Sequence, residues 1–157
     1  MTNPQTQTQN KVEYSIHPAT LLGYVSLTVS NLDSQIAFYQ QALGFILRWR
    51  AGSQAGLGTD QADLLQLTEQ ANMKRYRRVT GLYHFAIVFP DRRELARAVA
   101  RLFTLKYPNY PTDHIMTKTT YLNDPEGNGI ELYAESAEDG MFLFENGDLS
   151  PAGPMAA

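Results

Sequence analysis

LGYVSLTVSNLDSQIAFYQQALGF (residues 22–45) and LYHFAIVFPDRRELARAVARLF (residues 82–103) share one pattern, and this repetition decides the fold. Each stretch opens with alternating apolar and polar residues, which is the period of a strand with two different faces. A capping residue follows, and apolar residues then recur at helical spacing. In the first copy, Gly44 stands where a glycine typically ends a helix. Both copies therefore predict a strand followed by a helix.

Further strand patterns follow each predicted helix. In the first copy, the glycine-containing stretches AGSQAG (residues 51–56) and GTDQ (residues 58–61) are typical of hairpin turns and divide residues 45–69 into strands. In the second copy, we expect strands at about 112–116, 118–123 and 129–135. The predicted fold class is α+β, with two tandem βαβββ modules. They are expected to form a curved, partly closed mixed β-sheet around a concave site, with the helices outside.

The 157 residues suffice for one ordinary domain or for two small repeats that share a core. The predicted organisation has five parts in chain order. These are a flexible N-terminal tail at 1–20, the first module at 21–69, an inter-module loop at 70–80, the second module at 81–136 and a C-terminal tail at 137–157.

Composition excludes several classes of protein. Hydrophobic residues make up 43% and charged residues 18% of the chain, which is a globular composition, and the formal charge of -3 argues against a nucleic-acid partner. The absence of Cys excludes disulfides, thiolate metal sites and a cysteine nucleophile. The longest apolar run, FAIVF at 85–89, is far too short to span a membrane, and the polar first ten residues lack a secretory signal. We therefore expect a cytoplasmic protein with no membrane partner.

Strand alternation singles out three polar side chains. If each helix covers the apolar face of its sheet, Tyr24 and His84 point to the opposite, concave face. A histidine so placed lines a cavity, although a half-buried, hydrogen-bonded structural histidine fits the spacing equally well. Glu131 alternates with Ile130 and Leu132 in the last strand, and a carboxylate there costs free energy unless it is paired, hydrogen-bonded or ligated.

Trp49 lies between Arg48 and Arg50 on a predicted strand. Strict alternation places its side chain on the face opposite both arginines. The sequence leaves open whether that face lines the cavity or an interface.

The doubled unit resembles the vicinal oxygen chelate superfamily, which includes glyoxalase I, extradiol ring-cleaving dioxygenases and the bleomycin- and fosfomycin-resistance proteins. The resemblance covers roughly residues 20–135, and it is strongest to the catechol 2,3-dioxygenase-like branch through residues 17–45 and 121–135. An extradiol pattern of spaced residues is matched by His114, Tyr121, Asp124, Pro125, Gly127 and Glu131. Thr120 departs from that pattern, because an apolar residue is expected there.

The resemblance implies a divalent metal held by one His from the first strand of each module and a Glu from the final strand. His84 and Glu131 match two of these ligands, while Tyr24 stands in place of the other His. Such a site is typical of Fe(II) oxygenases, so Fe(II) is expected, with Mn(II) or Zn(II) as alternatives. A phenol with a pKa near ~10 is a poor ligand unless the metal deprotonates it. Gln66 matches a fourth ligand position, although a structural amide fits there as well.

His114 and Tyr121 match the residues that hydrogen-bond substrate oxygens near the metal in the family. An imidazole and a phenol can donate hydrogen bonds to a catecholate oxygen and stabilise its charge. The alternative interpretation of His114 is a histidine in an exposed turn with no catalytic role. The acid–base His of the extradiol enzymes has no counterpart in Thr68-Glu69-Gln70.

The leading hypothesis is a metal-dependent extradiol ring-cleaving dioxygenase-like protein of aromatic compound catabolism, acting on a catechol-type substrate, with a metal site weakened by Tyr24. A non-catalytic small-molecule-binding module of the bleomycin-resistance type is the first alternative. A glyoxalase-like isomerase or transferase is the second. The expected partners are a small aromatic molecule and, because four-stranded units expose their edges, a second copy in a homodimer.

Overall fold

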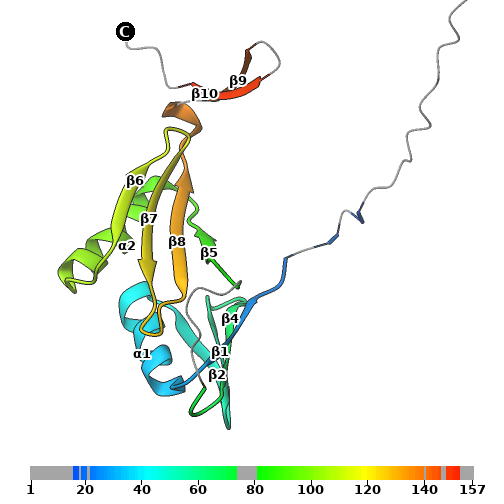
Figure 1. Cartoon of the computed structure of the whole chain (residues 1–157), viewed down its shortest axis with the longest axis vertical. Coiled ribbons are helices and arrows are strands. Elements are labelled where there is room, and N and C mark those ends of the chain that lie inside the picture. The colour runs from blue at the N-terminus through cyan, green and yellow to red at the C-terminus, as the bar shows by residue number, and fades with distance from the viewer. Residues whose placement is uncertain are drawn as a thin grey trace, which may run out of the picture.

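The chain follows the same path twice in the structure, a computed structural model that describes residues 16–17, 19–20, 22–73, 81–139, 141–145 and 148–152. The first module consists of β1 (Val25–Val29), α1 (Leu32–Leu43), β2 (Ile46–Ala51), β3 (Gln54–Gly58) and β4 (Asp63–Glu69). The second consists of β5 (His84–Val88), α2 (Arg92–Thr104), β6 (Tyr110–Asp113), β7 (Thr117–Asn123) and β8 (Gly129–Glu135). Figure 1 shows the second module above the first.

Each module forms a four-stranded mixed sheet with the same topology. The strand orders are β1-β4-β3-β2 and β5-β8-β7-β6. In both sheets the leading strand pairs parallel with the last strand of its module, and the other neighbours are antiparallel. The predicted α+β fold with two βαβββ modules is confirmed. The two sheets stay separate in the described part of the chain and do not close into barrels.

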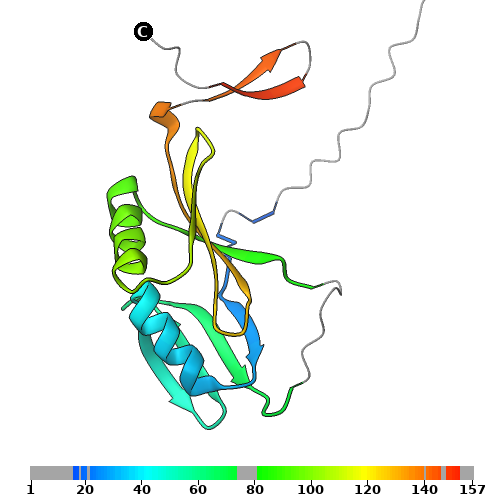
Figure 2. The same ribbon diagram turned by 60° about the vertical axis from the view of Figure 1, so that its left-hand side comes forward.

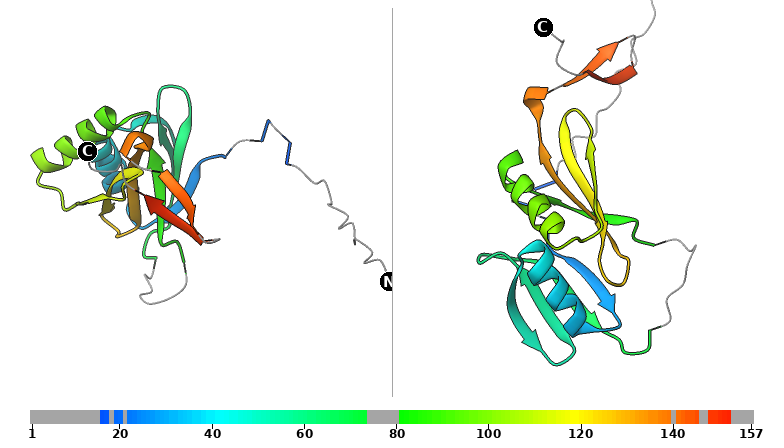
Figure 3. Two further views of the ribbon diagram at one scale, coloured as in Figure 1. Left: turned by 90° about the horizontal axis from the view of Figure 1, so that it is seen from above. Right: turned by 90° about the vertical axis from the view of Figure 1, so that its left-hand side faces the viewer.

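One face of each sheet is apolar and is covered by a helix. In β1, Leu27 and Val29 are buried while Ser26 and Thr28 are exposed, as alternation predicts. The helices α1 and α2 contact each other as well as their sheets (Figures 2 and 3), so both modules contribute to one core. The largest fully buried apolar side chains of that core are Tyr39, Leu32, Leu57, Leu65, Leu67, Leu102, Ile130, Leu132 and Val29.

Side chains satisfy the amides at the start of α1. Asn31 caps α1 by accepting a hydrogen bond from the Ser34 amide (2.8 Å). Glu69 accepts one from the Leu32 amide (3.1 Å). Glu126, from the turn between β7 and β8, accepts from the amides of Ser30 (2.8 Å) and Asn31 (3.1 Å). A carboxylate of the second module thus caps a helix of the first, where the helix dipole favours negative charge.

The first helix ends at Gly44, as the sequence predicts, and a single side chain caps the start of the second. Gly44 ends α1 in the left-handed region with φ at 75°, and Arg101 of α2 lies over it, so that an added Cβ would meet the guanidinium Nη1 at 2.6 Å. Asp91 caps α2 by accepting from the Glu94 amide (2.8 Å). In a capping box the Glu94 carboxylate would also accept a hydrogen bond from the Asp91 amide. In this structure it pairs with Arg97 instead (2.6 Å).

The segment expected to be a C-terminal tail contains further structure. A short 3-10 helix, η1 (Ala137–Asp139), is followed by an antiparallel hairpin of β9 (Met141–Glu145) and β10 (Asp148–Ala152). The expected N-terminal tail and inter-module loop fall largely outside the described residues. Within the described ranges, neither helix has the length and hydropathy of a membrane span.

The cap across the two modules can be tested by replacing Glu126→Ala. This change leaves two amides at the start of α1 without their carboxylate, so we expect the free energy of unfolding to fall by about 1 kcal/mol, as for a lost helix cap. Urea denaturation monitored by circular dichroism measures the loss. Glu135→Ala, at an exposed glutamate that ends β8, is the matched control and should cost much less. Equal stability losses in the two variants would contradict the capping role.

Candidate active site

The face of the second sheet that α2 leaves uncovered, the second open face, gathers the polar residues singled out in the sequence. Ile130 and Leu132 of β8 are buried on the helix side, so Glu131 between them points to the open face. In the β7–β8 pairing Tyr121 stands directly opposite Glu131. His84 begins the parallel neighbour β5. Three strands thus bring one side chain each to the same place.

Four of the predicted site residues form one hydrogen-bonded chain. His84 Nε2 lies 2.9 Å from Glu131 Oε2. The Tyr121 hydroxyl donates to Glu131 Oε1 (2.9 Å). His114 Nε2 lies 3.1 Å from the Tyr121 oxygen. This chain, His84–Glu131–Tyr121–His114, is called the polar array below.

The positions of the protons in the polar array follow from which of its atoms can donate a hydrogen bond and which can only accept one. Partial burial, and then the hydrogen bond and negative charge of Glu131, raise the pKa of the Tyr121 phenol, so Tyr121 keeps its proton. Since that proton goes to Glu131, the Tyr121 oxygen is an acceptor, and His114 Nε2 must carry a hydrogen. Glu131 therefore accepts on both oxygens, which is how a carboxylate in the middle of a strand is stabilised.

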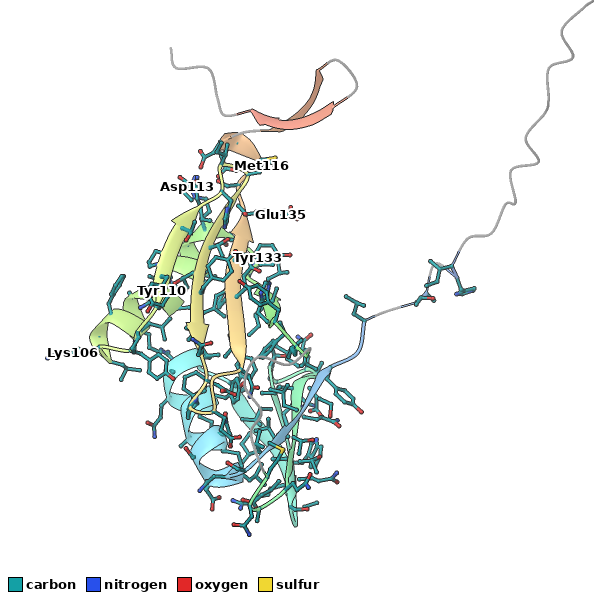
Figure 4. The ribbon with its side chains drawn as sticks, in the orientation of Figure 1. Lys106, Tyr110, Asp113, Met116, Tyr133 and Glu135 are labelled. Carbon is teal, nitrogen blue, oxygen red and sulfur yellow. The ribbon has the colours of Figure 1, made fainter. Side chains whose placement is uncertain are left out.

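The turn that carries His114 is held by contacts with η1 and with the residue that follows β8. Figure 4 shows Asp113, Met116 and Glu135 together at one end of the sheet. The Ser136 amide donates to the Met116 carbonyl (2.7 Å), which ties the turn to the end of β8. Lys118 joins the turn to η1 by bonding Asp113 (2.7 Å) and Asp139 (2.8 Å). The hydrogen bond from Lys118 is the main reason that the pKa of Asp113 lies below its ordinary range.

Aromatic side chains flank the polar array. A cavity of about 170 Å³ is lined by Tyr83, Tyr110 and Tyr121 together with His84. Tyr83 and Tyr110 are mostly exposed, so the cavity opens to solvent between them. In Figure 4, Tyr110 lies at β6 and Tyr133 at β8, on either side of β7. The cavity is of the size of a single small aromatic ring and offers phenol and imidazole groups to it.

Of the other two predicted metal ligands, Gln66 lies on β4 of the first sheet and Tyr24 lies directly before β1. They line a different cavity, of about 550 Å³, on the face that α1 leaves uncovered, the first open face. The Gln66 amide donates to Asp63 Oδ2 (3.0 Å). In the described part of the chain no three His, Asp or Glu side chains are grouped so as to hold a metal. The structure therefore brings together His84 and Glu131 but not the set of four.

Asp63 organises the first open face, and the sequence analysis missed it. Its carboxylate bonds Arg48 Nε (2.8 Å), Trp49 Nε1 (2.8 Å) and the Gln66 amide. The prediction that Trp49 lies opposite both arginines is wrong for Arg48. A register shift between Leu47 and Trp49 interrupts the alternation, so Arg48 and Trp49 reach the same carboxylate. A bulge of this kind leaves no clear signal in the sequence.

The end of β4, next to the place where an acid–base His would stand in the extradiol enzymes, has a structural role. Glu69 caps α1 through the Leu32 amide. The chain has three His residues, and two of them belong to the polar array. Any imidazole proton transfer near the cavity would therefore fall to His84 or His114.

Known proteins share the sequence and the fold. The chain is 42% identical over 124 residues to the catechol-2,3-dioxygenase of Bacillus subtilis (strain 168), in a match that covers 77% of this chain and 44% of the relative. The chain thus spans less than half the length of that curated relative.

Solved structures with the same fold include a lactoylglutathione lyase from Agrobacterium tumefaciens (TM-score 0.60, 22% identity, 75% of this chain and 96% of that one). A glyoxalase/dioxygenase from Nostoc punctiforme has a TM-score of 0.63 at 20% identity, covering 80% of this chain and 99% of that one. At these identities the likeness concerns the fold alone. The family model described as "Glyoxalase/Bleomycin resistance protein/Dioxygenase superfamily" matches residues 21–132, which include β1 to β7 and most of β8. The chain belongs to this superfamily.

Proposed function

We propose that this protein is an extradiol dioxygenase-like enzyme that cleaves a catechol-type aromatic substrate with the help of a divalent metal. The observation that carries the proposal is the polar array, because one carboxylate, two imidazoles and a phenol meet beside a cavity of single-ring size. The catechol-2,3-dioxygenase relative supports the same chemistry. We also propose that the protein lies in the cytoplasm and acts in the catabolism of aromatic compounds.

The donor set of the polar array fits a divalent metal in part. His84 Nε2 and Glu131 Oε2 are an imidazole nitrogen and a carboxylate oxygen 2.9 Å apart, both suitable ligands. Held there, a divalent metal would polarise the catechol oxygens and, as Fe(II), activate dioxygen, with Mn(II) or Zn(II) as alternatives. Tyr24, directly before β1, and Gln66 of β4 belong to the first module, so only two of the four proposed donors lie together. We therefore expect weaker metal binding than at a full site of two His and one carboxylate.

The remaining residues of the polar array handle protons and position the substrate. Tyr121 keeps its proton at neutral pH, since its pKa is raised, and can give a hydrogen bond to a catechol oxygen that replaces Glu131 as its acceptor. His114 donates to the Tyr121 oxygen and so stabilises any negative charge that develops on it. Tyr83 and Tyr110 provide flat apolar surface for the ring.

A metal-free binding module remains the second candidate function. The observation in its favour is that Tyr24 and Gln66 line a cavity that His84 and Glu131 do not, which leaves the predicted ligand set divided between the two modules. Such a protein would bind catechol without turning it over. A glyoxalase-like reaction has less support, because the Gln66 amide is engaged with Asp63.

Metal content tests the assigned ligands. We expect protein purified without chelator to carry less than one Fe, Mn or Zn per chain, and His84→Ala to lose it, because the imidazole donor is gone. The fold should persist, since the His84 side chain is 30% exposed and lies outside the core. Elemental analysis with circular dichroism measures both. His17→Ala is the control and should retain the metal. Equal metal content in the two variants would contradict the assignment of His84 as a metal ligand.

Oxygen uptake with a panel of catechols tests the reaction. Replacing Tyr121→Phe keeps the ring and removes the hydroxyl, so we expect kcat to fall by about 100-fold, as for the loss of one proton-transfer group. Tyr133→Phe, which removes a hydroxyl from the same sheet outside the polar array, should leave kcat unchanged. No oxygen uptake by the metal-loaded parent protein with any catechol, together with catechol binding that survives chelation, would favour the binding module instead.

The homodimer also remains a proposal, and its support is apolar surface. Leu82 and Val88, at or next to the edge strand β5, are each more than half exposed. We expect a dimeric mass by light scattering at micromolar concentration. Val88→Lys should shift the mass toward the monomer, because it places a charge in the covered surface, whereas Phe103→Lys, at an equally exposed apolar side chain of α2, should not. A monomeric parent protein across that range would end the proposal.

A further inference from the structure

The turn that carries His114 contains a strained residue. Of the non-glycine residues with positive φ in the described ranges, Ile115 is the β-branched one, and its φ is 67°. In this left-handed region the Cβ lies too close to the following carbonyl oxygen, which lowers the population of the conformation about tenfold when nothing else favours it. The turn therefore requires contacts that hold it in place.

Two side chains bind the backbone of the strained residue. Asp113 Oδ1 accepts a hydrogen bond from the Ile115 amide (2.8 Å). Lys118 Nζ donates to the same Asp113 oxygen (2.7 Å) and to the Ile115 carbonyl (3.3 Å). Figure 4 shows Asp113 and Met116 at this turn, on either side of Ile115 in the sequence. One ion pair thus holds both the amide and the carbonyl of Ile115.

The lysine of this ion pair is also anchored from outside the turn, by η1. Lys118 Nζ lies 2.8 Å from Asp139 Oδ2. Asp139 is itself held by Arg92 (3.1 Å) and by the Ser136 hydroxyl (2.7 Å). The hydrogen bonds to Asp113 and to Asp139 are the main reasons that the pKa of Lys118 is raised, so its charge is retained at neutral pH. The three hydrogens of the ammonium group thus have three acceptors.

The position of His114 depends on the conformation of Ile115, because the two residues are adjacent. The His114 amide donates to the Thr117 carbonyl (3.0 Å), and its Nε2 lies 3.1 Å from the Tyr121 oxygen. A change of Ile115 to a negative φ would redirect the chain at the tip of the turn and break the amide bond to Thr117. The imidazole would then move away from the Tyr121 hydroxyl.

We propose that Lys118 is a positioning residue, which holds His114 against the polar array by opposing the backbone strain at Ile115. Asp139 links this action to η1, so the segment that follows β8 takes part in ordering the site. Lys118 and Tyr121 lie on opposite faces of β7, so the lysine acts through the turn and not on the substrate. The effect on catalysis rests on the proposed function, whereas the effect on the turn does not.

Hydrogen exchange and kinetics together test the proposal. Lys118→Met keeps the length of the side chain and removes the ammonium group. We expect the His114 amide to exchange about tenfold faster, because the strain is no longer opposed. The kcat of oxygen uptake with catechol should fall by a similar factor of about ten, since His114 is displaced for most of the time. KM should stay unchanged, because the tyrosine rings that receive the substrate are not affected.

A second substitution separates this role from a general one in stability. Asparagine adopts the left-handed conformation with little strain, so Lys118→Met/Ile115→Asn should restore both the exchange rate and kcat to within about twofold of the parent. Arg97→Met is the matched control, because it removes a cation from an exposed ion pair of α2, and it should change neither value.

Equal exchange of the His114 amide in Lys118→Met and Arg97→Met would overturn the proposal. A loss in Lys118→Met that Ile115→Asn does not restore would overturn it too, because the lysine would then act on the fold as a whole.

If Lys118→Met does not fold, Asp139→Asn takes its place. It weakens the anchor of the lysine and leaves the Asp113 ion pair, so exchange should be about threefold faster, as for one exposed ion pair, and unchanged exchange would contradict the proposal. Hydrogen exchange needs no turnover. A parent protein without oxygen uptake would therefore end the proposed function while the exchange rates still decide the role of Lys118.

Discussion

The buried carboxylate of Asp124 holds the turn between β7 and β8 in one conformation, and both the site and the contact between the modules follow from it. It accepts hydrogen bonds from the amides of Glu126 (2.9 Å) and Asn128 (2.8 Å) and from the Asn128 side chain (2.7 Å). These bonds stabilise a charge that burial alone would disfavour. On one side the turn sets the register that places Tyr121 opposite Glu131. On the other side it presents Glu126 to α1, and Tyr39 of α1 donates to Asp124.

Much of this could be predicted from the sequence because it depends on local periodicity. Alternation in β5 and β8 sends His84 and Glu131 to one face, and the repeat of the βαβββ pattern makes these two strands neighbours. The caps Asn31 and Asp91 and the stop at Gly44 are likewise decided within one helical turn. Such features require no knowledge of distant parts of the chain.

The features that could not be predicted depend on irregular backbone or on long-range packing. The bulge at Arg48 reverses the expected orientation of one side chain and so creates the Asp63 contacts. The Glu126 cap joins residues about 95 positions apart, which no local pattern indicates. The match to known ligand positions grouped Tyr24 and Gln66 with His84 and Glu131, and only the fold shows that Tyr24 and Gln66 line a cavity that His84 does not. The two modules thus share a topology and differ in the chemistry of their open faces.

The metal centre that we propose for this chain is the pair of His84 and Glu131. A crystal structure of the protein grown with Mn(II), with anomalous scattering collected for manganese, tests it directly. The account predicts an anomalous peak within bonding distance of His84 Nε2 and a Glu131 oxygen, with the Tyr121 hydroxyl turned away from that carboxylate. A fully ordered polar array that keeps its hydrogen bonds, with no peak there or with the peak at Tyr24 and Gln66, would contradict it.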